Sequence, residues 1–433
     1  MLFADIDLLD ENLEYRTHQW VGVKDAHIAY IGSEPPAPDS AQSYGEVYDG
    51  RGKLLIPALF NAHTHAPMTL LRGYAENLPL QSWLNDMVWP FEAKMTPEDN
   101  YWATLLNLAE MARFGVVSLS DMYYATDERV AAVVEAHMKM NVCESEMFFE
   151  PKPYAAYASC ERTKRFVEQY HEAYGGRIRV DYNIHAEYTS NEQTCRDLAE
   201  VAREKGLPIH IHISETKSEH EECKERHGGM TPIQYFESIG ALDIPAIAAH
   251  CVWVEDADLD IMAARKVNVV CNPASNMKLA SGFAPVPKML ERGINVCLGT
   301  DGMASNNNND MFQDMYLMAL IYKGATLDPT VVSPRQVLHA ATRAGAIAQG
   351  RKDCGCVKVG MRADVCVLDV SGPAWCPMTD ALTNVVYAGH GSDVVLTMCD
   401  GCVVYRDGAW PYLDVERAKA EVAARTKRIM SEV

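Results

Sequence analysis

Apolar runs that end in polar side chains recur along the middle of the chain, with more polar stretches between them. The run LLIPALFNAHTH at 54–65 is typical, because it is almost wholly apolar up to Phe60 and then ends in His63 and His65. Strands that are buried on both faces, as in parallel sheets, read as such nearly continuous apolar runs. We therefore predict eight strands, within 54–65, 116–124, 141–149, 177–188, 208–216, 246–254, 267–276 and 294–302.

The stretches between these runs have helical periodicity. Residues 97–115 and 190–206 repeat apolar side chains at intervals of about 3.6 residues, and each ends in a glycine, a common helix stop. Residues 256–266 have the same spacing. Strands that alternate with helices form parallel sheets, and eight such units indicate an α/β fold of the closed (β/α)8 TIM type. The rival, an open doubly wound sheet, is expected to carry a glycine-rich turn after its first strand, and this sequence has none.

Both ends of the chain have a different pattern. Residues 1–55 and 358–412 consist of short β-like pieces, which predict one small β-sandwich domain assembled from both termini. The barrel would then occupy 56–357, and the amphipathic tail 413–433 would form a C-terminal helix. A length of 433 residues suits a barrel of about 250 residues together with a smaller unit.

The composition limits the classes of binding partner and the compartment that we expect for the protein. Asp and Glu number 59 against 39 Lys and Arg, a formal net charge of −20, which argues against nucleic acid or an anionic membrane as partner. No apolar stretch is long enough to span a membrane, and acids occupy the first residues, where a signal peptide needs positive charge. The 13 cysteines lack the spacing of a disulfide framework or a zinc finger. We therefore expect a protein of a reducing compartment, the cytoplasm.

Active sites of (β/α)8 barrels form at the carboxyl ends of the strands, so the polar residues there are the candidates for chemistry. Residues two apart on a strand point to the same side, so His63 and His65 are aimed at one place. His210, two residues before His212, is expected to pack in the core. Burying so many polar groups costs several kcal/mol each unless something satisfies them, and a divalent metal does so. We expect a metal site at these strand ends, which carry His63, His65, His185, His212, Glu215, His250 and Asp301.

A nitrogen-rich ligand set completed by one carboxylate suits Zn²⁺, with Fe²⁺ or Mn²⁺ as alternatives. Such a metal lowers the pKa of bound water toward about 7 and so makes hydroxide available as a nucleophile. The charged segment 215–229 also carries possible ligands, His220, Cys223 and His227, three and four residues apart. We interpret that segment as a solvated helix face.

Five motifs resemble the amidohydrolase superfamily in their order and spacing. They are NAHTHAPMTLLRG, HIHISET, AAHCVW, NPASNMKL and GTDGMASNNNNDMF. More narrowly, the combination of HTHAPMTLLRG, NPxSNxKL and TDGxASNNN resembles the S-adenosylhomocysteine/5′-methylthioadenosine deaminase branch of that superfamily. The likeness extends over almost the whole chain, including the two-part β-sandwich.

The resemblance implies a role for each strand-end residue. A single metal would be held by His63, His65, His212 and Asp301. Glu215 would be the proton shuttle, His250 would hydrogen-bond the attacking hydroxide without ligating, and Asp301 would double as the base.

The number of metals depends on strand four. Binuclear members of the superfamily bridge their metals through a lysine or a carboxylate on that strand, and 177–188 contains no lysine. Asp181 and Glu187 lie there, so the absence of lysine favours one metal without deciding the matter.

The same resemblance assigns substrate contacts. Trp83 would line the nucleoside pocket, Glu92 would bind the ribose hydroxyls and His185 would contact the purine. Homologues that accept S-adenosylhomocysteine hold its carboxylate with arginines between strands three and four, where Arg162 is the only plausible counterpart.

Acids replace cations in this region of the chain. Glu144, Glu146 and Glu150 follow strand three, and Glu187 is expected near the mouth of the pocket. Acids there would repel a substrate carboxylate. The sequence therefore favours adenosine analogues with a small or neutral 5′ group, namely 5′-methylthioadenosine, 5′-deoxyadenosine or adenosine.

We expect a metal-dependent hydrolytic deaminase that converts adenosine analogues, S-adenosylhomocysteine included, to inosine analogues and ammonia. Metal hydroxide would attack the purine carbon that bears the amine. The expected partner is a small nucleoside, and the resemblance suggests a homo-oligomer. Two alternatives stay open: an amidohydrolase that acts on a free aminopurine, a pterin or a triazine ring, and a non-catalytic homologue. Glu92 favours the first reading, because a ribose ligand has no purpose with a free base.

Overall fold

The computed structural model describes residues 1–37 and 42–433, and its central strands form two five-stranded parallel sheets. One sheet has the order β15 (Asp301–Gly302), β6 (Leu59–His65), β7 (Val116–Tyr123), β8 (Lys139–Glu144) and β9 (Ile178–Val180). The other has the order β10 (Tyr182–Ile184), β11 (Ile209–Ile213), β12 (Ala246–His250), β13 (Asn268–Cys271) and β14 (Asn295–Leu298). Parallel strands and the helices between them confirm the predicted α/β class.

Two of the predicted strands divide between these sheets. The run 177–188 is interrupted at Asp181, so that β9 pairs with β8 and β10 pairs with β11. The run 294–302 is interrupted after Leu298, so that β14 pairs with β13 and β15 pairs with β6. Continuous segments therefore join the two sheets at both edges, which is the arrangement that a closed barrel requires. Closure into a (β/α)8 barrel stays our prediction.

The first predicted strand is also two strands, which corrects our reading of 54–65. Its first half belongs to β5 (Lys53–Pro57), which pairs with the terminal strand β16 (Val365–Asp369) and not with the central sheets. Leu54 to His63 are all buried, so the hydrophobic pattern carries no mark of the junction at Ala58.

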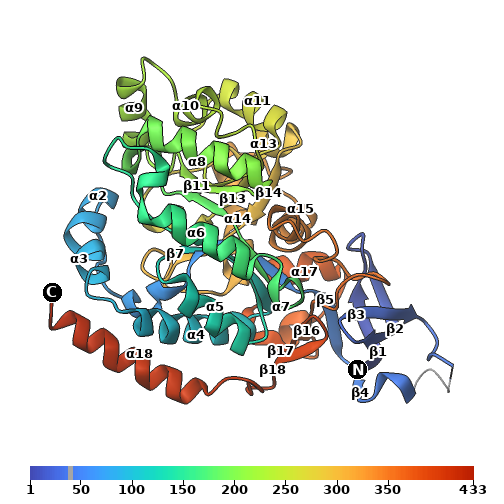
Figure 1. Cartoon of the computed structure of the whole chain (residues 1–433). Coiled ribbons are helices and arrows are strands. Elements are labelled where there is room, and N and C mark those ends of the chain that lie inside the picture. Colours follow the sequence, from blue (N-terminus) through green and yellow to red (C-terminus); the bar gives the residue numbers. More distant parts are fainter. Residues whose placement is uncertain (38–41) are drawn as a thin grey trace.

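Segments from both ends of the chain form one further sheet, at the lower right of Figure 1. Phe3, Ile6, Val21, Val365 and Leu396 belong to a hydrophobic cluster of its own. Its division into the two layers of a sandwich, and the predicted domain boundaries, stay predictions. The remaining strands of this sheet are β1 (Leu2–Leu9), β2 (Tyr15–Lys24), β3 (His27–Gly32), β4 (Val47–Asp49), β17 (Val394–Cys399) and β18 (Cys402–Arg406).

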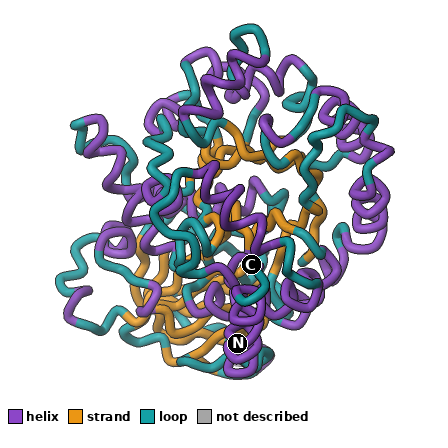
Figure 2. Tube along the Cα trace, turned by 90° about the vertical axis from the view of Figure 1, so that its left-hand side faces the viewer, coloured by secondary structure: helices purple, strands orange, loops and turns teal. Residues whose placement is uncertain are grey.

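The periodic stretches form helices α4 (Pro97–Arg113), α8 (Glu192–Lys205) and α11 (Asp256–Arg265). Thr96 caps α4 in a reciprocal capping box with Asp99, and Gly206 ends α8 with a φ of 67°. Helices surround the upper strands in Figure 2. The other helices are α2 (Leu80–Ser82), α3 (Trp89–Glu92), α5 (Thr126–Glu135), α6 (Ala158–Tyr170), α7 (Ala173–Gly176), α9 (Lys217–Arg226), α10 (Pro232–Ser238), α12 (Pro273–Lys278), α13 (Val286–Glu291), α14 (Met311–Thr326), α15 (Pro334–His339), α16 (Gly345–Ala348), α17 (Ala381–Tyr387) and α18 (Val415–Met430).

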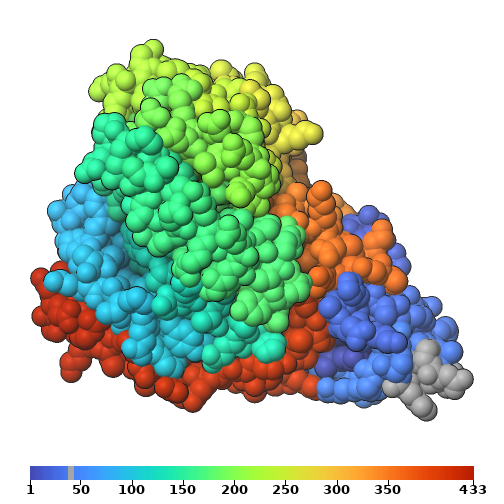
Figure 3. All heavy atoms as spheres, in the orientation of Figure 1, coloured from blue at the N-terminus to red at the C-terminus, as the bar shows by residue number. Residues whose placement is uncertain are grey.

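Helix α18 lies along the lower edge of the molecule, against α4 (Figures 1 and 3). Two of its arginines reach the buried carboxylate of Asp99, Arg425 at 2.8 Å and Arg428 at 2.5 Å. Among the described residues, no helix has both the length and the apolar character needed to cross a membrane. Each of the 13 cysteines is free.

A buried ion pair joins the central strands to the terminal sheet. Lys139 on β8 contacts the carboxylate of Asp364, just before β16, and lies 2.8 Å from Asp400, just after β17. All three side chains are largely buried, so none can exchange its partner for water.

Lys139→Met is therefore expected to lower the free energy of unfolding by about 3–5 kcal/mol, because it leaves the buried carboxylate of Asp364 without a cation, although Asp400 keeps its contact with Arg362 at 3.3 Å. Urea unfolding followed by circular dichroism measures the change. Lys419→Met on the exposed side of α18, where Lys419 pairs only with Glu416, is the matched control and should change stability by less than about 1 kcal/mol. Equal effects of the two substitutions would contradict the role of Lys139.

Candidate metal centre and active site

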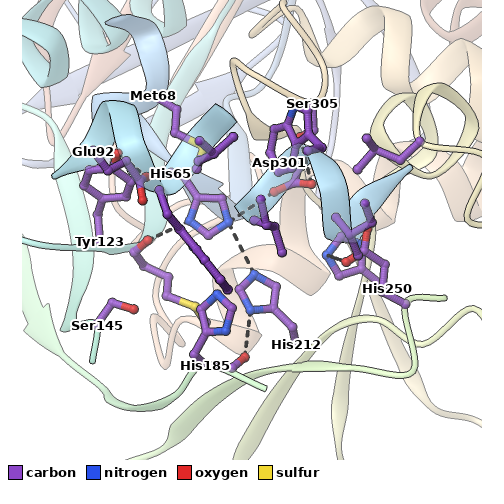
Figure 4. Close-up of a pocket in the computed structure, with 18 of the residues that line it drawn as sticks. His65, Met68, Glu92, Tyr123, Ser145, His185, His212, His250, Asp301 and Ser305 are labelled. Carbon is purple, nitrogen blue, oxygen red and sulfur yellow. Dashed lines mark hydrogen bonds and ion pairs between the residues drawn. The ribbon is translucent and has the colours of Figure 1, made fainter. Parts of the chain in front are cut away.

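Three histidines and one aspartate, namely His63, His65, His212 and Asp301, meet at the carboxyl ends of β6 and β11 and at β15. Figure 4 shows His65, His212 and Asp301 of this group. Asp301 Oδ1 lies 3.4 Å from His63 Nε2 and 3.3 Å from His65 Nε2. His65 Nε2 is 3.3 Å from His212 Nε2. The structure thus brings together the four side chains predicted as metal ligands, at distances that a single ion could span.

The rings of His65 and His212 are each held by a backbone carbonyl. His65 Nδ1 donates to the carbonyl of Met122 at 2.6 Å, and His212 Nδ1 donates to that of His185 at 2.7 Å. In both rings Nε2 is left facing the centre of the cluster (Figure 4). Proteins usually orient metal-binding histidines in this way, through a hydrogen bond from the ring nitrogen that does not bind the metal.

The ring of His63 is oriented by another histidine, His210. Its Nδ1 lies 2.9 Å from His210 Nε2, and both rings are completely buried. His210, which we expected only to pack, therefore also orients a candidate ligand. His63 Nε2 is buried with no hydrogen-bond partner among the described residues, and burial lowers the pKa of His63 to about 4. A neutral imidazole with an unsatisfied inward nitrogen fits a metal.

His210→Ala is expected to weaken zinc binding about 10–100-fold, as removal of an outer hydrogen-bond partner usually does. Competition with a chromophoric chelator measures the affinity, and circular dichroism checks the fold. His18→Ala, in the exposed part of β2, is the control and should bind zinc like the unchanged protein. Unaltered affinity in His210→Ala would mean that this histidine only fills space.

Asp301 is fixed so that only one of its oxygens faces the histidines. Ser275 Oγ and Ser305 Oγ donate to Oδ2 at 2.6 and 3.0 Å, which leaves Oδ1 for His63 and His65. Burial opposes ionisation, but the nearby imidazoles of His63, His65 and His250 outweigh it and hold the pKa of Asp301 well below its usual range. Its backbone has a φ of 63°, a left-handed conformation rare outside glycine and typical of functional sites.

Glu215 and His250 lie beside the cluster. Glu215 Oε2 is 3.9 Å from His250 Nε2, and Ser281 Oγ donates to Glu215 Oε1 at 3.3 Å. Burial raises the pKa of Glu215, so this carboxyl group can hold a proton more readily than one in water. The Glu219 carboxylate accepts hydrogen bonds from the backbone of Ser214 and of Glu215, both at 2.7 Å, and so fixes the turn that carries Glu215.

His250 is oriented by the segment after β13. Asn276 Oδ1 accepts from His250 Nδ1 at 2.9 Å, so His250 Nε2 points toward Glu215. Burial works to lower the pKa of His250, but the carboxylates of Glu215 and Asp301 outweigh it and raise the pKa.

Sequence reasoning missed these supporting residues. Ser275 and Asn276 lie in NPASNMKL, which carried part of the family resemblance without a role for any of its residues. Glu219 lies in the segment that we interpreted as a solvated face. The motif NPASNMKL was the one available signal for these residues. Its spacing does not say which side chain each hydroxyl or amide contacts.

A cavity opens from the cluster and contains three of the four predicted substrate residues. Trp83, Glu92 and His185 line it. Tyr123, His65, His212 and Asp301 line it as well (Figure 4). Tyr123 donates its hydroxyl to Glu92 Oε1 at 2.5 Å. Burial raises the pKa of Glu92 to about 7 and lowers that of His185 to about 3.

Arg162, the fourth predicted substrate residue, is not among the side chains that line the cavity. Its Nε lies 2.9 Å from Glu144 Oε1, and a terminal nitrogen lies 3.4 Å from Glu146 Oε2. The two acids that we expected to repel a substrate instead neutralise this arginine.

Glu187 also differs from our expectation, because it does not face the pocket. It is buried, contacts Arg226 at 2.5 Å and lies 2.8 Å from His227. His220 and Cys223 are buried as well, so the inner side of α9 is packed against the segment after β10 and is not solvated. The sequence spacing alone could not place Arg226 opposite Glu187.

Neither carboxylate of strand four reaches the histidine cluster. Asp181 accepts from Asn141 Nδ2 at 3.1 Å, and Glu187 is engaged by Arg226. Among the described residues near this centre, His63, His65 and His212 form one group of possible ligands, and His63, His250 and Asp301 form a second that shares His63. Three histidines and one aspartate are a set suited to one metal.

Comparison with known proteins adds independent observations. Residues 54–404 match the model of the amidohydrolase family. A 5-methylthioadenosine/S-adenosylhomocysteine deaminase of Acetivibrio thermocellus is 39% identical over 428 residues, which cover 99% of this chain and 98% of that protein. A 5′-deoxyadenosine deaminase of Methanothermobacter thermautotrophicus is 41% identical over 408 residues, 93% of this chain and 94% of that protein. The crystal structure of an adenosine deaminase from Xanthomonas campestris with bound zinc superimposes with a TM-score of 0.91 at 28% identity, covering 99% of this chain and 98% of that one.

Proposed function

This chain belongs to the amidohydrolase family, and on that premise we propose that it deaminates adenosine analogues hydrolytically at the cluster of His63, His65, His212 and Asp301. The observation that carries the proposal is the joint placement of this cluster with Glu215 and His250 at one end of the cavity. Relatives that match nearly the whole chain are deaminases of 5′-methylthioadenosine, S-adenosylhomocysteine or 5′-deoxyadenosine. The products would be the inosine analogue and ammonia.

One divalent metal would be held by the three histidines and Asp301. The unsatisfied Nε2 of His63 and the ionised carboxylate beside it support this assignment. When bound, such a metal activates a water molecule for attack at neutral pH. Zn²⁺ is our choice, because nitrogen-rich sites suit it and the Xanthomonas campestris structure contains zinc.

The protein's own side chains would move the protons. Asp301 and Glu215 would take both protons of the attacking water, the first as its oxygen adds to the ring and the second as that oxygen becomes the carbonyl. Glu215 would pass one of these protons to the ring nitrogen next to the reacting carbon and the other to the departing amine, which leaves as ammonia, so that both carboxylates are regenerated. His250, which donates through Nδ1 to Asn276, would hold the oxygen that adds to the ring through its other nitrogen.

Substrate binding would use other side chains that line the same cavity. We assign Glu92 to the ribose hydroxyls, since an acceptor carboxylate suits a vicinal diol, and Trp83 and His185 to the purine. Free-base deamination, the second candidate, leaves the half-buried Glu92 without a polar partner other than Tyr123.

Metal analysis followed by a substrate panel tests the proposal. The panel contains 5′-deoxyadenosine, 5′-methylthioadenosine, adenosine, adenine, guanine, a pterin and a triazine, each assayed for ammonia release. Nucleosides should be turned over and free bases should not. Turnover of free bases alone would overturn the proposal, and inactivity toward every compound in zinc-loaded protein would indicate a non-catalytic homologue.

A further inference from the structure

We infer that this site selects adenosine analogues whose 5′ group carries no carboxylate, so that 5′-deoxyadenosine and 5′-methylthioadenosine are preferred to S-adenosylhomocysteine. The inference rests on the proposed function and names the substrate class of the same site. The inference is based on Arg162, whose guanidinium pairs with two acids and does not line the cavity.

The charged side chains that line the cavity, apart from its histidines, are all acids. Glu92, Glu215 and Asp301 are among them, and the described lining contains neither lysine nor arginine. A carboxylate that binds in such a cavity is desolvated and has no cation to pair with, so its binding is disfavoured.

The charge of Arg162 is already countered by two acids. Glu144 and Glu146, the two acids that hold it, flank Ser145, which lines the cavity. The acids are held by further donors: Thr126 Oγ1 lies 2.7 Å from Glu144, and the backbone of Ser159 lies 3.0 Å from Glu146. A substrate carboxylate would have to displace one of these acids while lying next to the other.

A second hollow adjoins the main cavity beyond Glu92. The two share Trp89, Glu92 and Tyr124 as lining residues. The rest of its lining is Ala93, Met95, Asn100 and Met147, so Glu92 is its only charged group among the described residues. Aromatic and thioether side chains suit a methyl or methylthio group. The Oδ1 of buried Asn100 has no partner there, and an acceptor oxygen adds nothing to the binding of an anion.

The first test compares kcat/KM for 5′-deoxyadenosine, 5′-methylthioadenosine and S-adenosylhomocysteine in the zinc-loaded protein. We expect S-adenosylhomocysteine to be at least about tenfold poorer than the other two, because the carboxylate of its 5′ group finds no cation in this cavity, whereas the ammonium beside that carboxylate can pair with the acids. Equal or better turnover of S-adenosylhomocysteine would overturn the inference and leave the proposed function intact. Inactivity toward all three would instead defeat the proposed function.

Two sets of variants test whether the ion pairs with Glu144 and Glu146 keep Arg162 from binding a substrate carboxylate. Arg162→Gln should leave the ratio of S-adenosylhomocysteine to 5′-deoxyadenosine turnover unchanged, because the guanidinium is already occupied. The double variant Glu144→Gln/Glu146→Gln should free Arg162 and raise that ratio about tenfold. Adding Arg162→Gln to the double variant should remove the gain.

Glu161→Gln is the matched control for the double variant. It removes one acid from α6, the helix that carries Arg162, where Glu161 pairs only with Lys164 at the surface. We expect no change in the substrate ratio. A selective loss of S-adenosylhomocysteine turnover in the single variant Arg162→Gln would show that this arginine already binds the carboxylate, and would contradict the inference.

Discussion

Glu215→Gln is expected to lower kcat by about 10²–10⁴-fold, the range typical of a lost general acid–base group, while the protein keeps its metal. The amide has the size of the carboxyl group and can still accept the hydrogen bond from Ser281, so the turn that carries residue 215 should not move. An amide cannot take up and release a proton. Glu215 is also not one of the four donors at the centre, so zinc content should stay at that of the unchanged protein.

Ammonia release under single-turnover conditions, together with metal analysis, measures both effects. Glu221→Gln makes the same substitution on the exposed side of α9 and should leave both quantities unchanged. Full activity in Glu215→Gln would refute the proton-shuttle assignment, even if metal analysis agreed with the proposed ligands.

Asp301→Asn is expected to lose both metal and turnover. Ser275 and Ser305 donate to Oδ2, so they would hold the oxygen of the new amide at that position. Its NH₂ group would then face His63 and His65, and an amide nitrogen neither ligates a metal nor accepts a proton. We expect zinc affinity to fall by more than about 100-fold, beyond the loss usual for an outer hydrogen-bond partner.

Zinc titration against a competing chelator measures this loss, and assays at saturating zinc separate it from the catalytic effect. Asp260→Asn on the surface of α11, where Asp260 pairs with Arg292, is the control and should bind zinc normally. Normal zinc affinity in Asp301→Asn would remove Asp301 from the ligand set and leave the histidines to hold the ion.

Much of the candidate site could be predicted because its residues follow from local geometry. His63 and His65 share one side of a strand whatever the rest of the chain does, since successive strand residues alternate between faces. The carboxyl ends of parallel strands also lie at the same edge of a sheet, which brings Asp301 on β15 next to β6, whereas His212 comes from β11 in the other sheet. Wrong expectations arose where a side chain's partner comes from another segment, as with Glu187 and Arg226.

The sequence by itself determined the α/β class and the strand ends that carry the chemistry, because periodicity and residue type are properties of short segments. The identity of the four candidate ligands came from the resemblance to the amidohydrolase superfamily. Only the tertiary structure decided that Arg162 is held by Glu144 and Glu146, that Ser275 and Asn276 orient Asp301 and His250, and that the run 54–65 divides between two sheets. The physical reason is that a hydrogen bond or an ion pair requires two groups within about 3–4 Å, and separation along the chain does not set that distance.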